Sequence, residues 1–110
     1  MKKINLSITG CMGRMGQQLI KNSKKDRRFK LNSLTEGSFV SKKINGIKLQ
    51  LNTIDAFKNT DVIIDFTVPQ CTLEVLKIAS KLKKRVVIGT TGFTKKEESL
   101  INLTRKKYLY

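Results

Sequence analysis

Apolar residues along this chain recur at two spacings, one typical of strands and one typical of amphipathic helices. Strict alternation over residues 3–9 places Ile4, Leu6 and Ile8 on one face and predicts a first strand. Nearly continuous apolar runs at 61–67 and 85–89 are typical of strands that are buried on both faces of a parallel sheet. A further strand is predicted at 29–35 and a weak one at 47–51.

Four helical segments alternate with these strands: one that ends near residue 24, one at 53–59, one at 72–82, and one that begins near residue 94. Thr53 is a candidate N-cap, and Thr94 with Glu97 forms a capping box. Apolar side chains at helical spacing are expected to be buried, namely Met15, Leu19 and Ile20 in the first helix and Leu100, Ile101 and Leu103 in the last.

The remaining segments are short. Residues 37–46 are rich in Gly, Ser, Asn and Lys and predict an irregular loop, and residues 108–110 resemble the start of a further strand. Repeated strand–helix–strand units predict an α/β fold, a Rossmann-like doubly wound parallel sheet in a single domain that spans residues 1–110. Such sheets bind ligands beyond the carboxyl ends of their strands, so the residues that follow each strand are the candidate site.

The first strand is followed by the sequence Gly10-Cys11-Met12-Gly13-Arg14-Met15-Gly16. Glycine permits a tight turn, close approach of the backbone to a pyrophosphate, and packing of a helix on a strand. The next helix offers free N–H groups and a positive dipole end to phosphates. The spacing GxxGxxG is one residue longer than the usual GxGxxG. We predict a dinucleotide pyrophosphate site here, with a glycine-rich turn that binds nothing as the alternative; Arg14 either reinforces the site or faces solvent.

Glu36 ends the second strand, twenty positions after Gly16. An acidic residue there accepts hydrogen bonds from the adenosine ribose hydroxyls and favours NADH over NADPH. The next residue is Gly37 and not an arginine for the 2′-phosphate, with Lys42 and Lys43 in the loop as alternative partners for that phosphate. We predict NADH as the preferred cofactor and NADPH as the alternative; an ordinary exposed glutamate is the competing interpretation.

Two more segments follow the buried strands: Asp65-Phe66-Thr67-Val68-Pro69 and Gly89-Thr90-Thr91-Gly92-Phe93. A glycine beside threonine hydroxyls gives a flat ring close backbone approach and several hydrogen-bonding partners. We predict that both segments line the nicotinamide end of the crevice, with generic turn chemistry as the alternative.

Charge and composition narrow the functional classes. The 23 Lys and Arg against 8 Asp and Glu give a net charge of +15, which attracts polyanions. The lysines are scattered doublets and aromatic residues make up 6%, so a solvated surface is expected and a nucleic-acid-binding protein is the less favoured alternative. Cys11 and Cys71 are far apart and histidine is absent, so no metal site is predicted. With no apolar run near the roughly 20 residues that cross a bilayer, we expect a cytoplasmic protein without membrane partners.

Three segments in this order resemble the N-terminal domain of the 4-hydroxy-tetrahydrodipicolinate reductase (dihydrodipicolinate reductase) family of bacterial lysine biosynthesis. They are GxxGRMG at residues 10–16, Ile64-Asp65-Phe66-Thr67 with Pro69, and VIGTTGF at residues 87–93. The resemblance spans practically the whole chain. It implies that Gly10 to Met15 hold the pyrophosphate, that Glu36 holds the adenosine ribose, and that Phe66, Thr67, Gly89, Thr90 and Thr91 border the nicotinamide, with Thr91 also near the substrate. The implied reaction passes a hydride from NADH or NADPH to a small cyclic dicarboxylate.

Two features depart from that family. Many members carry an arginine directly after the acidic residue, where this chain has Gly37, and this favours NADH. The family's second half brings the substrate-binding sheet, the His-His-x-x-x-Lys proton donor and the tetramer contacts, which are absent from these 110 residues. The resemblance therefore implies a truncated cofactor domain with no catalytic residue, inactive alone, whose full-length relatives are homotetramers. A non-catalytic NAD(H)-binding module of the same fold is the alternative.

Overall fold

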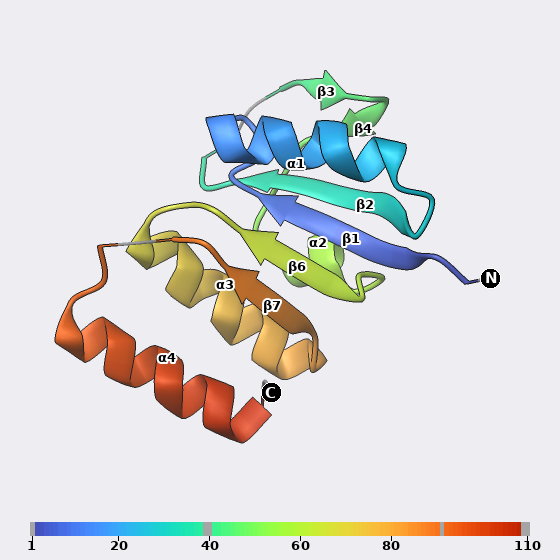
Figure 1. Ribbon diagram of the computed structural model, residues 1–110. Coiled ribbons are helices and arrows are strands. Elements are labelled where there is room, and N and C mark those ends of the chain that lie inside the picture. Colours follow the sequence, from blue (N-terminus) through green and yellow to red (C-terminus); the bar gives the residue numbers. More distant parts are fainter. Residues whose placement is uncertain (1, 39–40, 91, 109–110) are drawn as a thin grey trace.

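The computed structural model describes residues 2–38, 41–90 and 92–108, with side chains described as far as residue 102. Its main element is a five-stranded sheet in the order β5-β2-β1-β6-β7, in which every neighbouring pair is parallel (Figure 1). The strands are β1 (Ile4–Thr9), β2 (Phe29–Glu36), β5 (Gln50–Leu51), β6 (Val62–Asp65) and β7 (Arg85–Ile88). The first strand of the chain lies at the centre of the sheet, so the predicted doubly wound α/β fold is confirmed.

Helices cover both faces of this sheet (Figure 1). Helix α1 (Arg14–Lys25) lies over one face, and α2 (Ile54–Phe57) and α3 (Pro69–Leu82) lie over the other. Helix α4 (Lys95–Tyr108) runs alongside α3. None of the described helices has the length and apolar composition that a membrane crossing requires.

Each face of the sheet buries an apolar cluster of its own. The cluster under α1 is built on Leu6, Ile8, Cys11, Ile20, Leu34 and Leu49. The cluster under α2 and α3 is built on Ala56, Phe57, Ile63, Val75 and Ala79. Because β6 points Ile64 toward the first cluster and Ile63 toward the second, its apolar run is nearly continuous.

A β-bulge keeps the apolar residues of β2 on one face. Leu6 of β1 pairs with Leu31, but the next residue of β1 pairs with Ser33, so Asn32 is an extra residue. The bulge reverses the alternation, and Leu34 therefore joins Phe29 and Leu31 in the cluster under α1.

The irregular loop predicted over 37–46 is wrong in its second half. Strands β3 (Lys43–Ile44) and β4 (Ile47–Lys48) form an antiparallel hairpin beside α1 (Figure 1). Its turn residues Asn45 and Gly46 have φ angles of 53° and 80°, the left-handed conformation that an Asn-Gly pair adopts in tight hairpins. The Asn-Gly pair is the sequence signal for this hairpin. The strand predicted at 47–51 is interrupted at Leu49, which separates β4 from β5.

Three expectations about burial are also wrong. Met15 is 49% exposed, because the buried face of α1 begins at Gly16. Val87 is 55% exposed, because β7 forms the edge of the sheet instead of a strand covered on both faces. Leu100 is 46% exposed, because α4 packs along α3 and not on the sheet. The side chain of Leu103 lies outside the described residues.

The helix ends follow their capping signals. The Ala56 N–H donates to Thr53 Oγ1 at 3.2 Å, as predicted. Thr94 and Glu97 form the predicted capping box, with bonds of 2.8 and 3.1 Å.

Helices α3 and α4 differ from their predicted extents. Helix α3 begins three residues earlier than predicted, because Pro69 fits the first helical position, where no N–H partner is needed. Tyr108 is the last residue of α4 and not the start of a strand, and residues 109–110 lie outside the described chain.

Candidate dinucleotide-binding site

The loop between β1 and α1 turns sharply at Gly10. Its φ angle is +68°, and a Cβ there would lie 2.3 Å from the carbonyl oxygen of Phe66, so only glycine fits. The Gly10 N–H donates to the Thr35 carbonyl at 3.0 Å. These contacts hold the loop between the ends of β2 and β6.

The other two glycines of the loop differ in what a side chain at their position would contact. A Cβ on Gly16 would lie 2.2 Å from the Gly10 carbonyl oxygen and 2.7 Å from Cys11 Cα, so glycine lets α1 pack directly on the loop. A Cβ on Gly13 would meet only the Gly10 carbonyl oxygen, at 3.4 Å, and the φ angle of Gly13 is an ordinary −71°. The fold therefore requires glycine at 10 and 16, whereas at 13 it leaves the space open.

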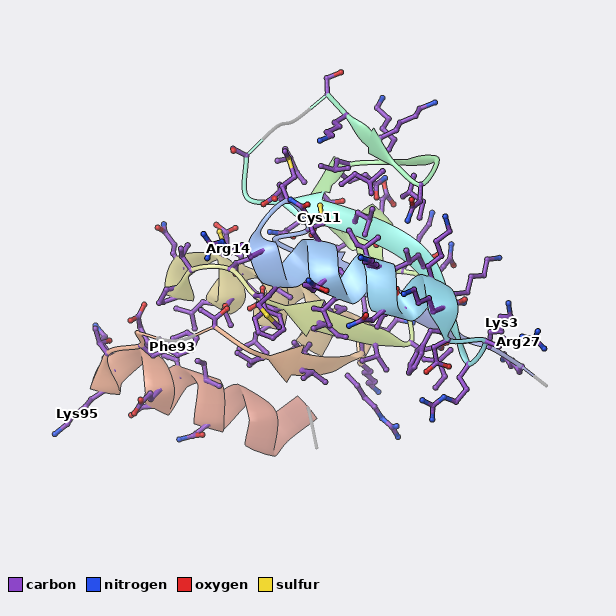
Figure 2. All side chains as sticks on the ribbon, turned by 45° about the horizontal axis from the view of Figure 1, so that its top comes forward. Lys3, Cys11, Arg14, Arg27, Phe93 and Lys95 are labelled. Carbon is purple, nitrogen blue, oxygen red and sulfur yellow. The ribbon has the colours of Figure 1, made fainter. Side chains whose placement is uncertain are left out.

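Helix α1 begins without a side-chain cap. Its N-cap is Gly13, whose carbonyl accepts the N–H of Gln17 at 2.9 Å. The N–H groups of Arg14, Met15 and Gly16 precede that bond and have no acceptor within the helix. This end of α1 therefore offers three donors and a partial positive charge, an arrangement that binds phosphates. Figure 2 shows Arg14 and Cys11 at this same end of the helix.

Glu36 lies at the end of β2, beside the glycine loop. Its Oε2 accepts the N–H of Met12 at 2.9 Å, and the Met12 carbonyl in turn accepts Gln17 Nε2 at 2.8 Å. The carboxylate is thereby fixed against the loop, within the group of predicted pyrophosphate residues.

A cleft of about 510 Å³ opens in front of this loop and joins the predicted segments. Its volume falls in the range of small-molecule sites, roughly 300–1,000 Å³. The lining comes from the ends of β1, β2 and β6 and the start of α3, and consists of Gly10, Met12, Gly13, Glu36, Gly37, Phe66, Thr67, Val68 and Cys71. The structure thus brings the glycine loop, the acidic residue and the Phe66–Thr67 segment together.

Cys11 takes a packing position behind the loop. Its side chain is fully buried, and its N–H donates to the Thr35 carbonyl at 3.4 Å. Burial, followed by the nearby Glu36 carboxylate, raises the pKa of the Cys11 thiol to about 11. The thiol is therefore protonated and unreactive at neutral pH.

A buried carboxylate lies beneath the Phe66–Thr67 segment. Asp65 is fully buried and accepts hydroxyl protons from four threonines, namely Thr9, Thr67, Thr72 and Thr90. The sequence predicts Asp65 only as part of a segment that lines the crevice, and no pattern singles out Thr9 or Thr72. The signal that could have found the network is a carboxylate at the end of an otherwise apolar strand.

Gly89 and Thr90 lie against this network and outside the cleft lining. A Cβ on Gly89 would meet ring carbons of Phe66 at 2.0–2.5 Å, and the Gly89 N–H donates to the Asp65 carbonyl at 2.8 Å. Thr90 is buried with its hydroxyl bonded to Asp65. Thr91 lies outside the described residues.

The two lysines weighed as phosphate partners lie in a separate groove. This groove, of about 520 Å³, runs between α1 and the β3–β4 hairpin and includes Lys42, Lys43 and Met12. Met12 lines the cleft as well, so groove and cleft are neighbours. The charge of Lys42 is close enough to lower the pKa of Cys11 slightly against the effect of burial. Among the described residues, no three His, Cys, Asp or Glu side chains gather as a metal site.

A sequence model of the family described as "Dihydrodipicolinate reductase, N-terminus" matches residues 4–109. A 4-hydroxy-tetrahydrodipicolinate reductase of Pelagibacter ubique (strain HTCC1062) is 73% identical over 101 residues, which are 92% of this chain and 39% of the relative. The enzyme of the same name from Wolbachia pipientis subsp. Culex pipiens (strain wPip) is 41% identical, over 82% of this chain and 39% of the relative. The chain thus spans about two fifths of the length of these relatives.

Among solved structures, a dipicolinate-bound dihydrodipicolinate reductase from Paenisporosarcina sp. TG-14 has the same fold. The superposition covers 94% of this chain and 43% of that chain, with a TM-score of 0.75 and 20% sequence identity. At this identity the likeness speaks for the fold alone.

Proposed function

The chain belongs to the dihydrodipicolinate reductase family, of which it matches the N-terminal domain, and we propose that residues 1–110 are the dinucleotide-binding domain of a 4-hydroxy-tetrahydrodipicolinate reductase. The observation that carries the proposal is the cleft in which the glycine loop, the open end of α1 and Glu36 meet. The whole enzyme would reduce 4-hydroxy-tetrahydrodipicolinate to tetrahydrodipicolinate in diaminopimelate and lysine biosynthesis.

The residues present fit a dinucleotide. The N–H groups of Arg14, Met15 and Gly16 would bind the pyrophosphate, and the space left open at Gly13 would admit it. Glu36 would accept the adenosine ribose hydroxyls. The bound cofactor supplies the hydride. Binding of the dicarboxylate substrate, proton donation and homotetramer contacts would come from the remaining three fifths of the enzyme.

We propose NADH as the preferred cofactor. Gly37 places no cation at the end of β2, and the Glu36 carboxylate would face the 2′-phosphate of NADPH at close range. Lys42 and Lys43, in the neighbouring groove, are the residues of this chain that would support NADPH as the second cofactor. A cytoplasmic location is proposed as well, and the two free cysteines support a reducing compartment.

Titration calorimetry of the chain at moderate salt is expected to show one saturable site for NADH. Glu36→Ala should weaken NADH roughly 10- to 100-fold, because a hydrogen bond to a charged acceptor contributes roughly 1.5–3 kcal/mol. The loss for NADPH should be smaller, since the substitution also removes repulsion of the 2′-phosphate.

Glu74→Ala is the matched control, because Glu74 is an exposed glutamate on α3 and its removal changes the net charge equally. Equal losses for NADH and NADPH would place Glu36 away from the ribose. A folded chain that binds neither cofactor would contradict the proposed function.

Cys71 is expected to report occupation of the cleft. It is half-buried in the cleft lining, so iodoacetamide should alkylate Cys71 and spare the fully buried Cys11. Burial, then the Glu74 and Asp65 carboxylates, raises the pKa of the Cys71 thiol above its ordinary value, so the alkylation rate should keep rising to a higher pH than it does for the unfolded chain. Saturating NADH should slow the reaction several-fold, as followed by peptide mass spectrometry.

The unfolded chain provides the control for this measurement, because in urea both cysteines should react at similar rates. Unchanged alkylation of Cys71 at a concentration of NADH that saturates the chain by calorimetry would place the cofactor outside this cleft.

A further inference from the structure

The carboxylate of Asp65 holds four separate segments of the chain together. Oδ1 accepts the hydroxyls of Thr9, at the end of β1, and Thr67, after β6. Oδ2 accepts those of Thr72, in α3, and Thr90, after β7. Among the described residues, the structure gives this fully buried carboxylate no ion pair, so hydroxyl protons alone compensate its burial.

The hydroxyl of Thr90 is the second junction of this network. Thr90 Oγ1 donates to Asp65 Oδ2 at 3.0 Å, accepts the Thr67 N–H at 2.9 Å, and lies 2.9 Å from Thr72 Oγ1. A hydroxyl has one proton, which Thr90 donates to Asp65, and one of its lone pairs accepts the Thr67 N–H. The Thr67 hydroxyl likewise donates its proton to Asp65 Oδ1, at 2.8 Å. Neither hydroxyl has a proton left for a ligand.

The network fixes the positions of Phe66 and Thr67, which form one wall of the cleft. The Thr67 N–H bond to Thr90 ties the loop after β6 to the loop after β7. The Gly89 N–H donates to the Asp65 carbonyl at 2.8 Å, and Gly89 leaves just enough room for the Phe66 ring. Phe66 and Thr67 line the cleft, so their positions depend on bonds made behind them.

We propose that Asp65 and its four threonines are a positioning network that fixes the nicotinamide side of the cleft, and that the hydroxyls of Thr67 and Thr90 serve this network and not the ligand. The inference rests on the proposed dinucleotide site. It assigns to Asp65 and Thr90 positioning roles, exerted through Phe66 and through the backbone of the two loops.

Substitutions at Thr90 test the network with two ligands. Thr90→Val keeps the shape of the side chain but leaves the Thr67 N–H without its acceptor and removes one of the two hydroxyls that Asp65 Oδ2 accepts. Thr90→Ser retains the hydroxyl. Thr90→Val should weaken NADH at least fivefold but change the affinity for ADP-ribose, which lacks the nicotinamide, by less than twofold. Thr90→Ser should bind both ligands within twofold of the unsubstituted chain.

Several outcomes would overturn the inference. These are equal weakening of NADH and ADP-ribose by Thr90→Val, a loss of NADH affinity in Thr90→Ser that matches the valine variant, or unchanged NADH affinity in a folded valine variant. Should Thr90→Val not fold, Thr67→Val against Thr67→Ser makes the same comparison. Failure of the unsubstituted chain to bind NADH or ADP-ribose would instead remove the proposed function itself.

Discussion

Gly16→Val is expected to abolish dinucleotide binding and to lower the free energy of unfolding by about 3 kcal/mol or more. The added Cβ would lie 2.2 Å from the Gly10 carbonyl oxygen and under 3 Å from the backbone of Cys11. Backbone atoms cannot rotate away as a side chain can, so α1 must separate from the loop. That movement takes the free N–H groups of the helix away from the cleft. Urea denaturation and calorimetric titration measure the two effects.

Gly13→Ala is the matched control from the same loop. Its Cβ would make only an ordinary 3.4 Å contact, so the free energy of unfolding should change by less than about 1 kcal/mol. NADH affinity should still fall at least tenfold, because the methyl group occupies the space through which a pyrophosphate approaches α1. A Gly13→Ala chain that binds NADH as tightly as the unsubstituted one would place the pyrophosphate elsewhere.

Gly37→Arg combined with Cys71→Ala is expected to raise NADPH affinity relative to NADH roughly 10- to 100-fold. The arginine would supply the charge-assisted bonds that a 2′-phosphate needs, worth roughly 1.5–3 kcal/mol. The second substitution is needed because a Cβ at position 37 would lie 2.9 Å from Cys71 Sγ. Cys71, in the first turn of α3, occupies the space in which a side chain at 37 would begin.

The single variants complete a thermodynamic cycle for this pair. Cys71→Ala alone should leave the ratio of the two affinities unchanged, and Gly37→Arg alone should raise it less than the double variant does. If Gly37→Arg alone matches the double variant, Cys71 is not what restricts position 37. A double variant without any gain would show that the 2′-phosphate lies away from this end of β2.

Local sequence patterns predicted the helices and strands better than they predicted which residues of those elements are buried. The alternation of Ile4, Leu6 and Ile8 identifies β1, yet a half-exposed strand would show the same alternation. In the structure Ser7 and Thr9 are fully buried as well. Their hydroxyl partners Ser33, Thr60 and Asp65 come from segments 26 to 56 positions away, which no period-two pattern reveals.

The candidate site likewise contains residues that the sequence identifies and residues that only the structure reveals. Its glycines and Glu36 could be singled out because each directly follows a strand, where a parallel sheet gathers its loops. The Asp65 network depends on which loops meet across the sheet, and this follows from the strand order. The exposed position of Val87 has the same origin, because an apolar run of this length looks alike in a central strand and in an edge strand.

The central place of β1 bears on how the chain folds as it is synthesised. Ile4 pairs with Phe29, 25 positions later, but on its other side Leu6 pairs with Val62, 56 positions later. At about 5–20 residues per second, the second partner follows roughly 3–11 s after the first strand has been made. Until then one edge of β1 is open to pairing with another chain. The strand at the centre of the finished sheet is therefore the one that waits longest for its second partner during synthesis.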